Sequence, residues 1–211
     1  MSDEPGIFEV MYTTRAMRRL KPDAVPEELL LKLVDAANQA ASASNSQVAR
    51  WVIVRDRDAV GKIAELNRAV AFAYANAGGS RPPSLPHQSD EARERQRKAF
   101  LWQARHLHEC PAIIVACQEA AGSRADTFAA GAGAGGSIWP QVQNLLLAAR
   151  ALGLGATPTT LPMANRAAFR EALALPENVE AFCVIPVGWP IGKFGPVSRK
   201  PVSEIVHWEQ W

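Results

Sequence analysis

Three short runs of apolar, largely β-branched residues constrain the fold more than any other feature of this sequence. They are WVIVR (51–55), AIIVAC (112–117) and AFCVIPVG (181–188), and each has the length and composition of a buried strand. Long stretches of chain separate them, and apolar residues recur there at the three- and four-residue spacing of amphipathic helices. A few widely spaced strands among many helices predict α/β or α+β layers around one central sheet.

The helical pattern is clearest over 26–40, where leucines repeat on one face and Pro26 suits the first turn. GATPTTLP (155–162) indicates a strand that enters a loop, and GGSRPPSLPHQS (78–89) is too rich in Gly, Pro and Ser for regular structure. The segment 68–109 separates two strands by more chain than a plain crossover needs, which is typical of a lid or a binding element. Further helices are predicted over 7–19, 57–76, 90–109, 138–152 and 165–173.

Composition favours a globular enzyme without a strongly charged partner. The chain has 211 residues, 48% of them hydrophobic, so it can bury a core within one domain. Its 23 basic and 21 acidic residues give a net charge of +2, which favours neither nucleic acid nor a membrane surface as partner. The acidic start has no apolar signal segment and no run reaches membrane-span length, so we expect a cytoplasmic protein. Three cysteines without a CxxC pair argue against a disulfide framework or a zinc site.

One glycine motif invites a dinucleotide-binding interpretation. Gly131, Gly133 and Gly136 match G-x-G-x-x-G, and a predicted helix follows them. A Rossmann site also needs a strand immediately before the glycines and an acidic residue about 20 positions after them. ADTFAA precedes the motif and Ala156 stands at the acidic position, so the sequence context argues against that site. No P-loop and no G-x-S-x-G nucleophile motif occurs elsewhere in the chain.

Three polar segments stand out from the apolar pattern. TTRAMRRL (13–20) is rich in arginine, SASNSQ (42–47) carries small hydroxyl and amide side chains, and VSRKP (197–201) sets an arginine near the C-terminus. Arginine suits phosphate because its planar guanidinium donates two parallel hydrogen bonds and stays charged. Taken singly, the three segments are equally compatible with an exposed basic face, a plain loop and a solvated tail.

In this order, and together with LLLAARALGLGATPTTLP and VIPVGWPIGKFG, these segments resemble the nitroreductase family. The resemblance extends over nearly the whole chain and is thinnest between about 68 and 109. Two departures concern the polar segments: Val48 and Ala49 follow Gln47 where the family often has Pro-Trp, and Thr14 stands where many members carry another arginine.

The resemblance implies an α+β sandwich, in which helices flank a central mixed sheet of four or five strands. It implies one FMN-binding domain over 1–211, with a helical excursion at about 68–109. Two such chains would intertwine as a homodimer, the tail at about 189–211 embracing the partner. FMN would lie at the interface between them.

The resemblance also implies roles for individual residues. Arg15 and Arg199 would contact the FMN phosphate, and Arg18 would approach N1 and O2 of the flavin ring, where negative charge develops. Pro158, Thr159 and Thr160 would line the flavin edge, with a backbone N–H directed at N5. The remaining FMN-contacting positions are Ala16, Met17 and, partly from the partner subunit, Ser42, Ser44, Asn45 and Gln47. The acceptor side would be formed by Phe100, Trp102 and His106, although these aromatic side chains are equally compatible with simple helix packing.

The implied activity is an FMN-dependent oxidoreductase that takes electrons from NAD(P)H and reduces a small planar acceptor, a nitroaromatic or a quinone, by a ping-pong mechanism. Because the cofactor carries the chemistry, no catalytic acid or nucleophile is expected from the protein. Three alternatives stay open: a flavin carrier or sensor without turnover, a family relative with reductive dehalogenase or flavin-destroying chemistry, and a Rossmann-type dehydrogenase.

Overall fold

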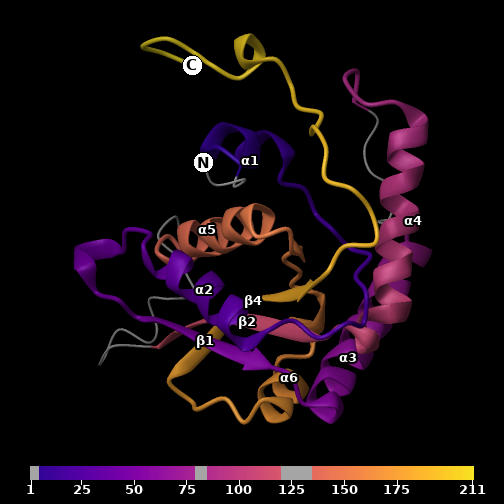
Figure 1. The fold of residues 1–211 in the computed structure, drawn as a ribbon, viewed down its shortest axis with the longest axis vertical. Helices are drawn as coiled ribbons and strands as arrows, with labels where there is room; N and C mark the ends of the chain where they lie inside the picture. The colour runs from indigo at the N-terminus through magenta and orange to yellow at the C-terminus, as the bar shows by residue number, and fades with distance from the viewer. Residues whose placement is uncertain (1–4, 79–84, 120–134) are drawn as a thin grey trace.

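The computed structural model describes residues 5–78, 85–119 and 135–211. Figure 1 shows helices on both sides of one small sheet, with the C-terminal segment extending away from it. The helices are α1 (Ile7–Thr13), α2 (Glu27–Asn38), α3 (Arg57–Asn76), α4 (Asp90–His106), α5 (Ile138–Ala151) and α6 (Arg166–Ala172). The strands are β1 (Ala49–Val54), β2 (Ala112–Glu119), β3 (Gly155–Ala156) and β4 (Val179–Gly188). Short 3-10 turns are η1 (Ala43–Asn45), η2 (Leu107–Glu109), η4 (Leu161–Ala164) and η5 (Val202–Glu204).

The four strands form one sheet in the order β1-β2-β4-β3. The long central pair, β2 and β4, is antiparallel, and so are its pairings with β1 and β3. The predicted α+β class and strand number are therefore confirmed. The expected mixture of parallel and antiparallel pairs is wrong for the described residues, because every connection between paired strands returns the chain in the opposite direction.

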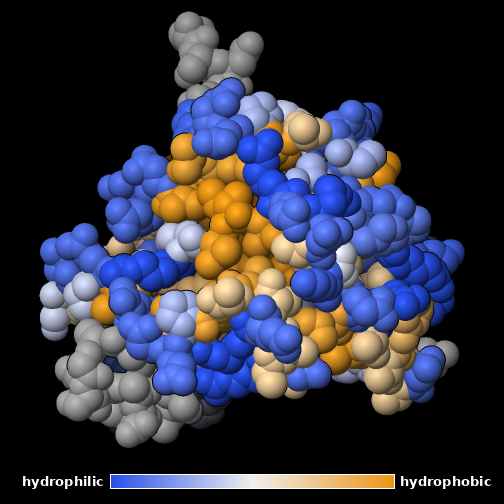
Figure 2. Space-filling model, turned by 90° about the horizontal axis from the view of Figure 1, so that it is seen from below, coloured by the Kyte–Doolittle hydropathy of each residue, from blue (hydrophilic) through white to orange (hydrophobic). Residues whose placement is uncertain are grey.

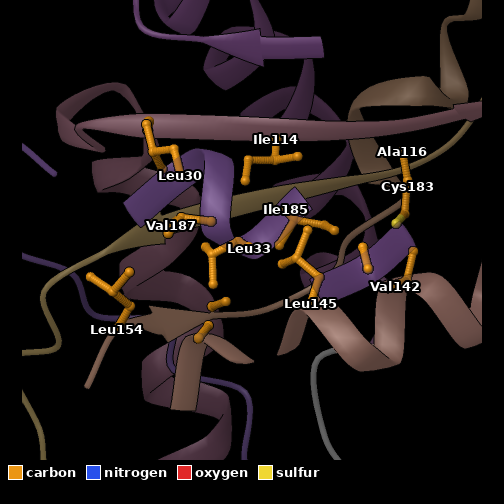
Figure 3. Close-up of a cluster of buried hydrophobic side chains, with 14 of the residues drawn as sticks. Leu30, Leu33, Ile114, Ala116, Val142, Leu145, Leu154, Cys183, Ile185 and Val187 are labelled. Carbon is orange, nitrogen blue, oxygen red and sulfur yellow. The ribbon is translucent and has the colours of Figure 1, made fainter. Parts of the chain in front are cut away.

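Both faces of the sheet are covered, which explains why its central strands are apolar without interruption. Side chains alternate along β2, so Ile114 faces one side and Ile113 the other. On the first side, α2 and α5 pack leucines such as Leu33 and Leu145 against Ile114 and Ile185 (Figure 3). The second side is covered by α3, α6 and the turn η2, with fully buried side chains at Val60, Ile63 and Phe169.

Most predicted elements lie within one or two residues of the observed ones, but three predictions need correction. The helix predicted over 7–19 ends at Thr13, because residues 14–20 run extended toward the sheet. The helix predicted to residue 109 ends at His106 and continues as the turn η2. The strand predicted over 155–162 is regular for Gly155–Ala156 alone. Gly131 and Gly133, and residues 79–84 of the predicted loop, lie outside the described residues.

The excursion between the first two strands is a pair of helices beside the sheet (Figure 1). The α4 helix begins at Ser89, whose hydroxyl accepts a hydrogen bond from the Ala92 N–H at 3.2 Å, and acidic residues occupy its first turn. Tyr74 of α3 and Phe100 of α4 meet edge to face, with ring centroids 6.0 Å apart. No helix among the described residues is long and apolar enough to cross a membrane.

Candidate functional site

The arginine-rich segment after α1 is held in place by the sheet edge. The Met17 N–H donates to the Ala156 carbonyl at 3.2 Å, and Leu20 forms an isolated bridge with Pro190. Met17 and Leu20 are buried, whereas Arg18 between them is half-buried and Arg19 is exposed. An added Cβ at Gly155 would lie 2.7 Å from Leu20 Cδ2 and 2.9 Å from Met17 Cβ, so the close approach of this segment needs a glycine there.

The segment that follows β4 runs antiparallel to residues 14–21 and reaches α4 (Figure 1). The Lys21 N–H donates to the Trp189 carbonyl at 2.8 Å, and the Ile191 N–H donates to the Arg19 carbonyl at 3.0 Å. Further along, the Ser198 hydroxyl donates to the His87 carbonyl, just before α4 begins. Three segments that are far apart in the sequence therefore converge at one place: the N-terminal arginines, α4 and the C-terminal segment.

These three segments enclose a cavity of about 460 Å³, which we call the arginine cavity. Its wall contains Arg15, Arg18, Arg95 and Arg199, with Gln88, Gln96 and Ser198 between them. The structure thus brings together all three arginines that the sequence assigned to a phosphate and a flavin ring. It adds Arg95 of α4, which the sequence analysis did not single out.

The arginine cavity concentrates positive charge without a matching carboxylate. None of its lining residues in the described part of the chain is Asp or Glu. Arg15 and Arg18 form no hydrogen bond or ion pair within residues 5–78, 85–119 and 135–211, and Arg199 donates to the neighbouring Ser198 carbonyl at 2.9 Å. Burial lowers the pKa of Arg18, yet a guanidinium stays charged at neutral pH. Such a cavity favours an anion with several acceptor oxygens, such as a phosphate.

Arg18 also lines a second cavity of about 340 Å³, which we call the aromatic cavity. Its lining includes the aromatic residues Tyr74, Phe100 and Trp139, and also Pro158, Thr159, Thr160 and Leu161. Both cavities fall within the size range of about 300–1,000 Å³ that is typical of cofactor and ligand pockets. The predicted flavin-edge residues and Phe100 therefore share one cavity next to Arg18.

The geometry distinguishes the backbone donors along this edge. Thr159 is paired with Val184 through both its N–H and its carbonyl, at 2.8 and 2.9 Å. The Leu161 N–H donates to the Thr159 hydroxyl at 3.3 Å. The Thr160 N–H has no partner in the described part of the chain, so it is the backbone donor that is available to a ligand at this edge.

Gln103 of α4 is a polar residue that the sequence analysis missed. It is 7% exposed, and its amide nitrogen is buried without a hydrogen-bond partner among the described residues. Its side chain lines the aromatic cavity beside Arg18. A buried donor without a partner costs about 1–3 kcal/mol. A ligand in the aromatic cavity would relieve that cost, and so would a water molecule in the gap of about 10 Å³ that Gln103 also lines. The signal in the sequence was the spacing of Ala92, Gln96, Ala99 and Gln103, which places small and amide residues on one face of a charged helix.

Two of the predicted acceptor-side residues are placed differently from Phe100. Trp102 and His106 line a gap of about 10 Å³ between Arg18 and η2, which has room for about one water molecule. Their rings stack on each other with centroids 4.4 Å apart, and His106 Nδ1 lies 3.1 Å from a Glu109 carboxylate oxygen. The structure does not bring them into the aromatic cavity.

The polar loop 42–47 lies away from both cavities of its own chain. It joins α2 to β1 on the side of the sheet opposite α4 (Figure 1), and Ser42, Ser44, Asn45 and Gln47 line neither cavity. Three of its residues have left-handed backbone angles, with φ of 52° at Ser44, 52° at Asn45 and 49° at Gln47. Such conformations cost free energy and cluster at functional sites. The loop therefore presents exposed polar side chains on a constrained backbone, where another molecule can reach them.

The chain is similar to known proteins over nearly its whole length. The model of the Nitroreductase family matches residues 11–189. An iodotyrosine deiodinase of Thermotoga neapolitana is 28% identical over 95% of this chain and 95% of its own length. An NADH dehydrogenase of Thermus thermophilus is 29% identical over 92% of this chain and 91% of its own. Among solved structures, an iodotyrosine deiodinase bound to FMN and 3-iodo-L-tyrosine is similar in fold, with a TM-score of 0.74, 23% identity and coverage of 98% and 100% of the two chains.

Proposed function

Because this chain belongs to the nitroreductase family, we propose that it is an FMN-dependent oxidoreductase that uses NAD(P)H to reduce small planar acceptors. One observation carries the proposal: Arg18 lies in the wall of both the arginine cavity and the aromatic cavity. FMN has a phosphate at one end and a planar, polar ring at the other, so it suits two cavities of that kind joined by an arginine. Its relatives support the same class, since one is an NADH dehydrogenase and a structure of another contains FMN.

The residues present fit the chemistry of FMN. Arg15 and Arg199 would hold the phosphate, as the resemblance implied, and the Ala16–Met17 backbone would lie beside them. Arg18 would lie at the ring. The unpartnered Gln103 amide and the Thr160 N–H would donate to polar atoms of the ring edge, which has several acceptors. Of these two donors, the Gln103 amide is buried, whereas Thr160 is exposed.

The protein's contribution is positioning and electrostatics. Bound FMN would supply hydride transfer from NAD(P)H and the passage of electrons to the acceptor. The permanent charge of Arg18 would favour negative charge next to it, in surroundings where burial strengthens the effect. Tyr74, Phe100 and Trp139 would hold a planar acceptor by stacking and would exclude water from it. Since one cavity would serve both nicotinamide and acceptor, we expect ping-pong kinetics.

The working unit in this proposal is a homodimer. Large apolar side chains near the C-terminus are exposed in the single chain, with Trp208 at 81% of its full accessible area, and Val202, Ile205 and Trp211 similarly open. Figure 2 shows further apolar surface on a different face, seen from below and away from the C-terminal segment. A partner subunit would cover such surface, and its 42–47 loop would complete the flavin site. The whole chain, 1–211, would act as one FMN-binding domain.

The test is a comparison of FMN binding by two neighbouring variants. Arg199→Gln removes a charge from the arginine cavity, whereas Lys200→Gln removes an equal charge from the adjacent residue, which does not line it. We expect Arg199→Gln to weaken FMN binding by about tenfold or more, and Lys200→Gln by less than about twofold. Fluorescence titration of the FMN-free protein measures both. Equal affinities for the two variants would contradict the proposed phosphate site.

A second candidate is reductive dehalogenation of a halogenated aromatic compound. The specific observation is the similarity to iodotyrosine deiodinases along nearly the whole chain, combined with an α4 helix that lines both cavities. Assays of the same FMN-loaded protein with 3-iodotyrosine and with a nitroaromatic compound separate the two reactions, by iodide release and by loss of nitro absorbance. A flavin carrier would turn over neither acceptor.

A further inference from the structure

The arginine cavity contains more positive charge than the phosphate of FMN requires. Four arginines line it, and its described lining residues include no carboxylate. A phosphate carries a charge of about −1.5 to −2 at neutral pH, which two guanidinium groups can match. In the proposed function, Arg15 and Arg199 take that role and Arg18 serves the ring. Arg95 is left without an assigned counter-charge in the cavity.

Arg95 lines the arginine cavity one helical turn before Ala99 and Phe100, where α4 passes from this cavity to the aromatic cavity. Ala92 and Ala99 flank it on the cavity side of the helix, and their small side chains leave space around the guanidinium. Phe100, five residues further, lines the aromatic cavity. Five residues advance about 7.5 Å along a helix axis and turn about 140° around it, so the two side chains leave α4 in different directions. The long arginine side chain would have to extend along the helix to meet a substituent on an aromatic ring stacked near Phe100.

The positive charge of Arg95 is not neutralised by a strong ion pair. No hydrogen bond or salt bridge joins it to another residue in the described ranges. Glu91, one turn earlier, interacts with Arg95 electrostatically. The pKa of Glu91 is lowered mainly by its own backbone N–H and the Ser89 hydroxyl, and less by Arg95. Glu91 does not line the cavity, and an exposed pair of this kind is worth little.

We propose that Arg95 is a specificity residue that recognises an anionic substituent, such as a carboxylate, on the planar acceptor. The inference rests on the proposed function, because it takes for granted that FMN fills the positions of Arg15, Arg18 and Arg199. The acceptor class is then an aromatic anion rather than a neutral aromatic compound. Arginine suits a carboxylate through two parallel N–H···O hydrogen bonds.

The experiment compares two acceptors of the same shape and different charge, 4-nitrobenzoate and 4-nitrobenzamide, on the FMN-loaded dimer. We expect a higher kcat/KM for the carboxylate and a loss of about fivefold in the carboxylate-to-amide ratio for Arg95→Gln. Activity with the amide and affinity for FMN would stay within about twofold. Arg95→Lys would keep part of the ratio. Lys98→Gln, which removes a charge from α4 outside both cavities, would leave it unchanged.

The other outcomes each overturn the inference in a recognisable way. An unchanged carboxylate-to-amide ratio in Arg95→Gln would show that Arg95 does not contact the acceptor. A large loss of FMN affinity in that variant would make Arg95 a third phosphate ligand instead. If the unaltered protein binds FMN but reduces neither acceptor, the proposed function itself fails, and the amide assay reveals this independently of Arg95. Added salt should lower the ratio for the unaltered protein, because it screens exposed charges.

Discussion

Gly155 allows residues 14–20, which carry Arg15 and Arg18, to pack closely against the sheet. Its replacement by alanine therefore tests how the candidate site depends on that close packing. The new Cβ would lie 2.9 Å from Met17 Cβ and 2.7 Å from Leu20 Cδ2, where ordinary contacts begin at 3.4 Å. The leucine methyl can rotate away, but Met17 Cβ is fixed to the backbone. The segment that carries Arg15 and Arg18 must therefore move by about half an ångström.

The expected loss of stability follows from this overlap. Overpacking of this kind costs about 1–3 kcal/mol. The Gly155 backbone is outside the left-handed region, so alanine can adopt it. Alanine also reduces the conformational freedom of the unfolded chain, which raises the free energy of unfolding by about 0.4–1 kcal/mol. The net destabilisation is about 0–2.6 kcal/mol. At the centre of that range, about 1.3 kcal/mol, Tm falls by about 3–5 °C for a chain of this size. FMN affinity should fall by about threefold to tenfold, because the arginines are displaced.

The assay is thermal unfolding with and without saturating FMN, together with an FMN titration. Gly61→Ala is the matched control: Gly61 lies inside α3 with no atom within 4 Å of an added Cβ. There, alanine should raise stability by about 0.5–1 kcal/mol, through its better helix propensity, and should leave FMN binding unchanged. If both substitutions raise Tm, or if Gly155→Ala binds FMN normally, the argument from close packing is refuted.

Three further predictions concern the buried side chains of Gln103 and the three cysteines. Gln103→Leu removes an unsatisfied buried amide, so the FMN-free protein should be as stable as before or more stable by about 1 kcal/mol, while FMN binding should weaken. Thermal unfolding measures the first effect and FMN titration the second. A marked loss of stability without FMN would contradict the prediction. Burial raises the pKa of Cys110 to about 11 and of Cys117 and Cys183 to about 12, so all three thiols should resist alkylation in the folded protein at pH 8 and react after unfolding. Rapid modification of the native protein would contradict that prediction. The same pKa shifts predict that the free energy of unfolding falls as the pH rises above about 9, because thiols of the unfolded chain ionise there while those of the folded chain stay protonated.

The elements that could be predicted from the sequence are those whose formation depends on local pattern. The apolar runs at β2 and β4 and the leucine face of α2 are specified by residues within each element, and the structure has them at nearly the predicted bounds. The extended path of residues 14–20 was not predictable in this way. It depends on pairing with Ala156 and Pro190, far along the chain, and the helical spacing at 7–19 carries no information about those partners.

The residues of the candidate site also divide into those that a local sequence pattern identifies and those that only the packing of distant segments identifies. Arg15, Arg18 and Arg199 were found because they lie in segments that resemble a family pattern. Arg95 and Gln103 were missed because a charged helix contains many such residues, and what distinguishes these two is the cavity that the packing of α4 creates. The placement of Trp102 and His106 against η2 likewise depends on how α4 ends.

The absorbance spectrum of the purified protein, recorded before and after anaerobic addition of NADPH or NADH, tests the central proposal most directly. The proposal predicts a yellow protein with bound FMN, whose visible flavin absorbance disappears when the nicotinamide is added and returns with a nitroaromatic acceptor. A yellow protein that keeps its absorbance would indicate a carrier or sensor. A colourless protein that takes up no added FMN would contradict the assignment of both cavities.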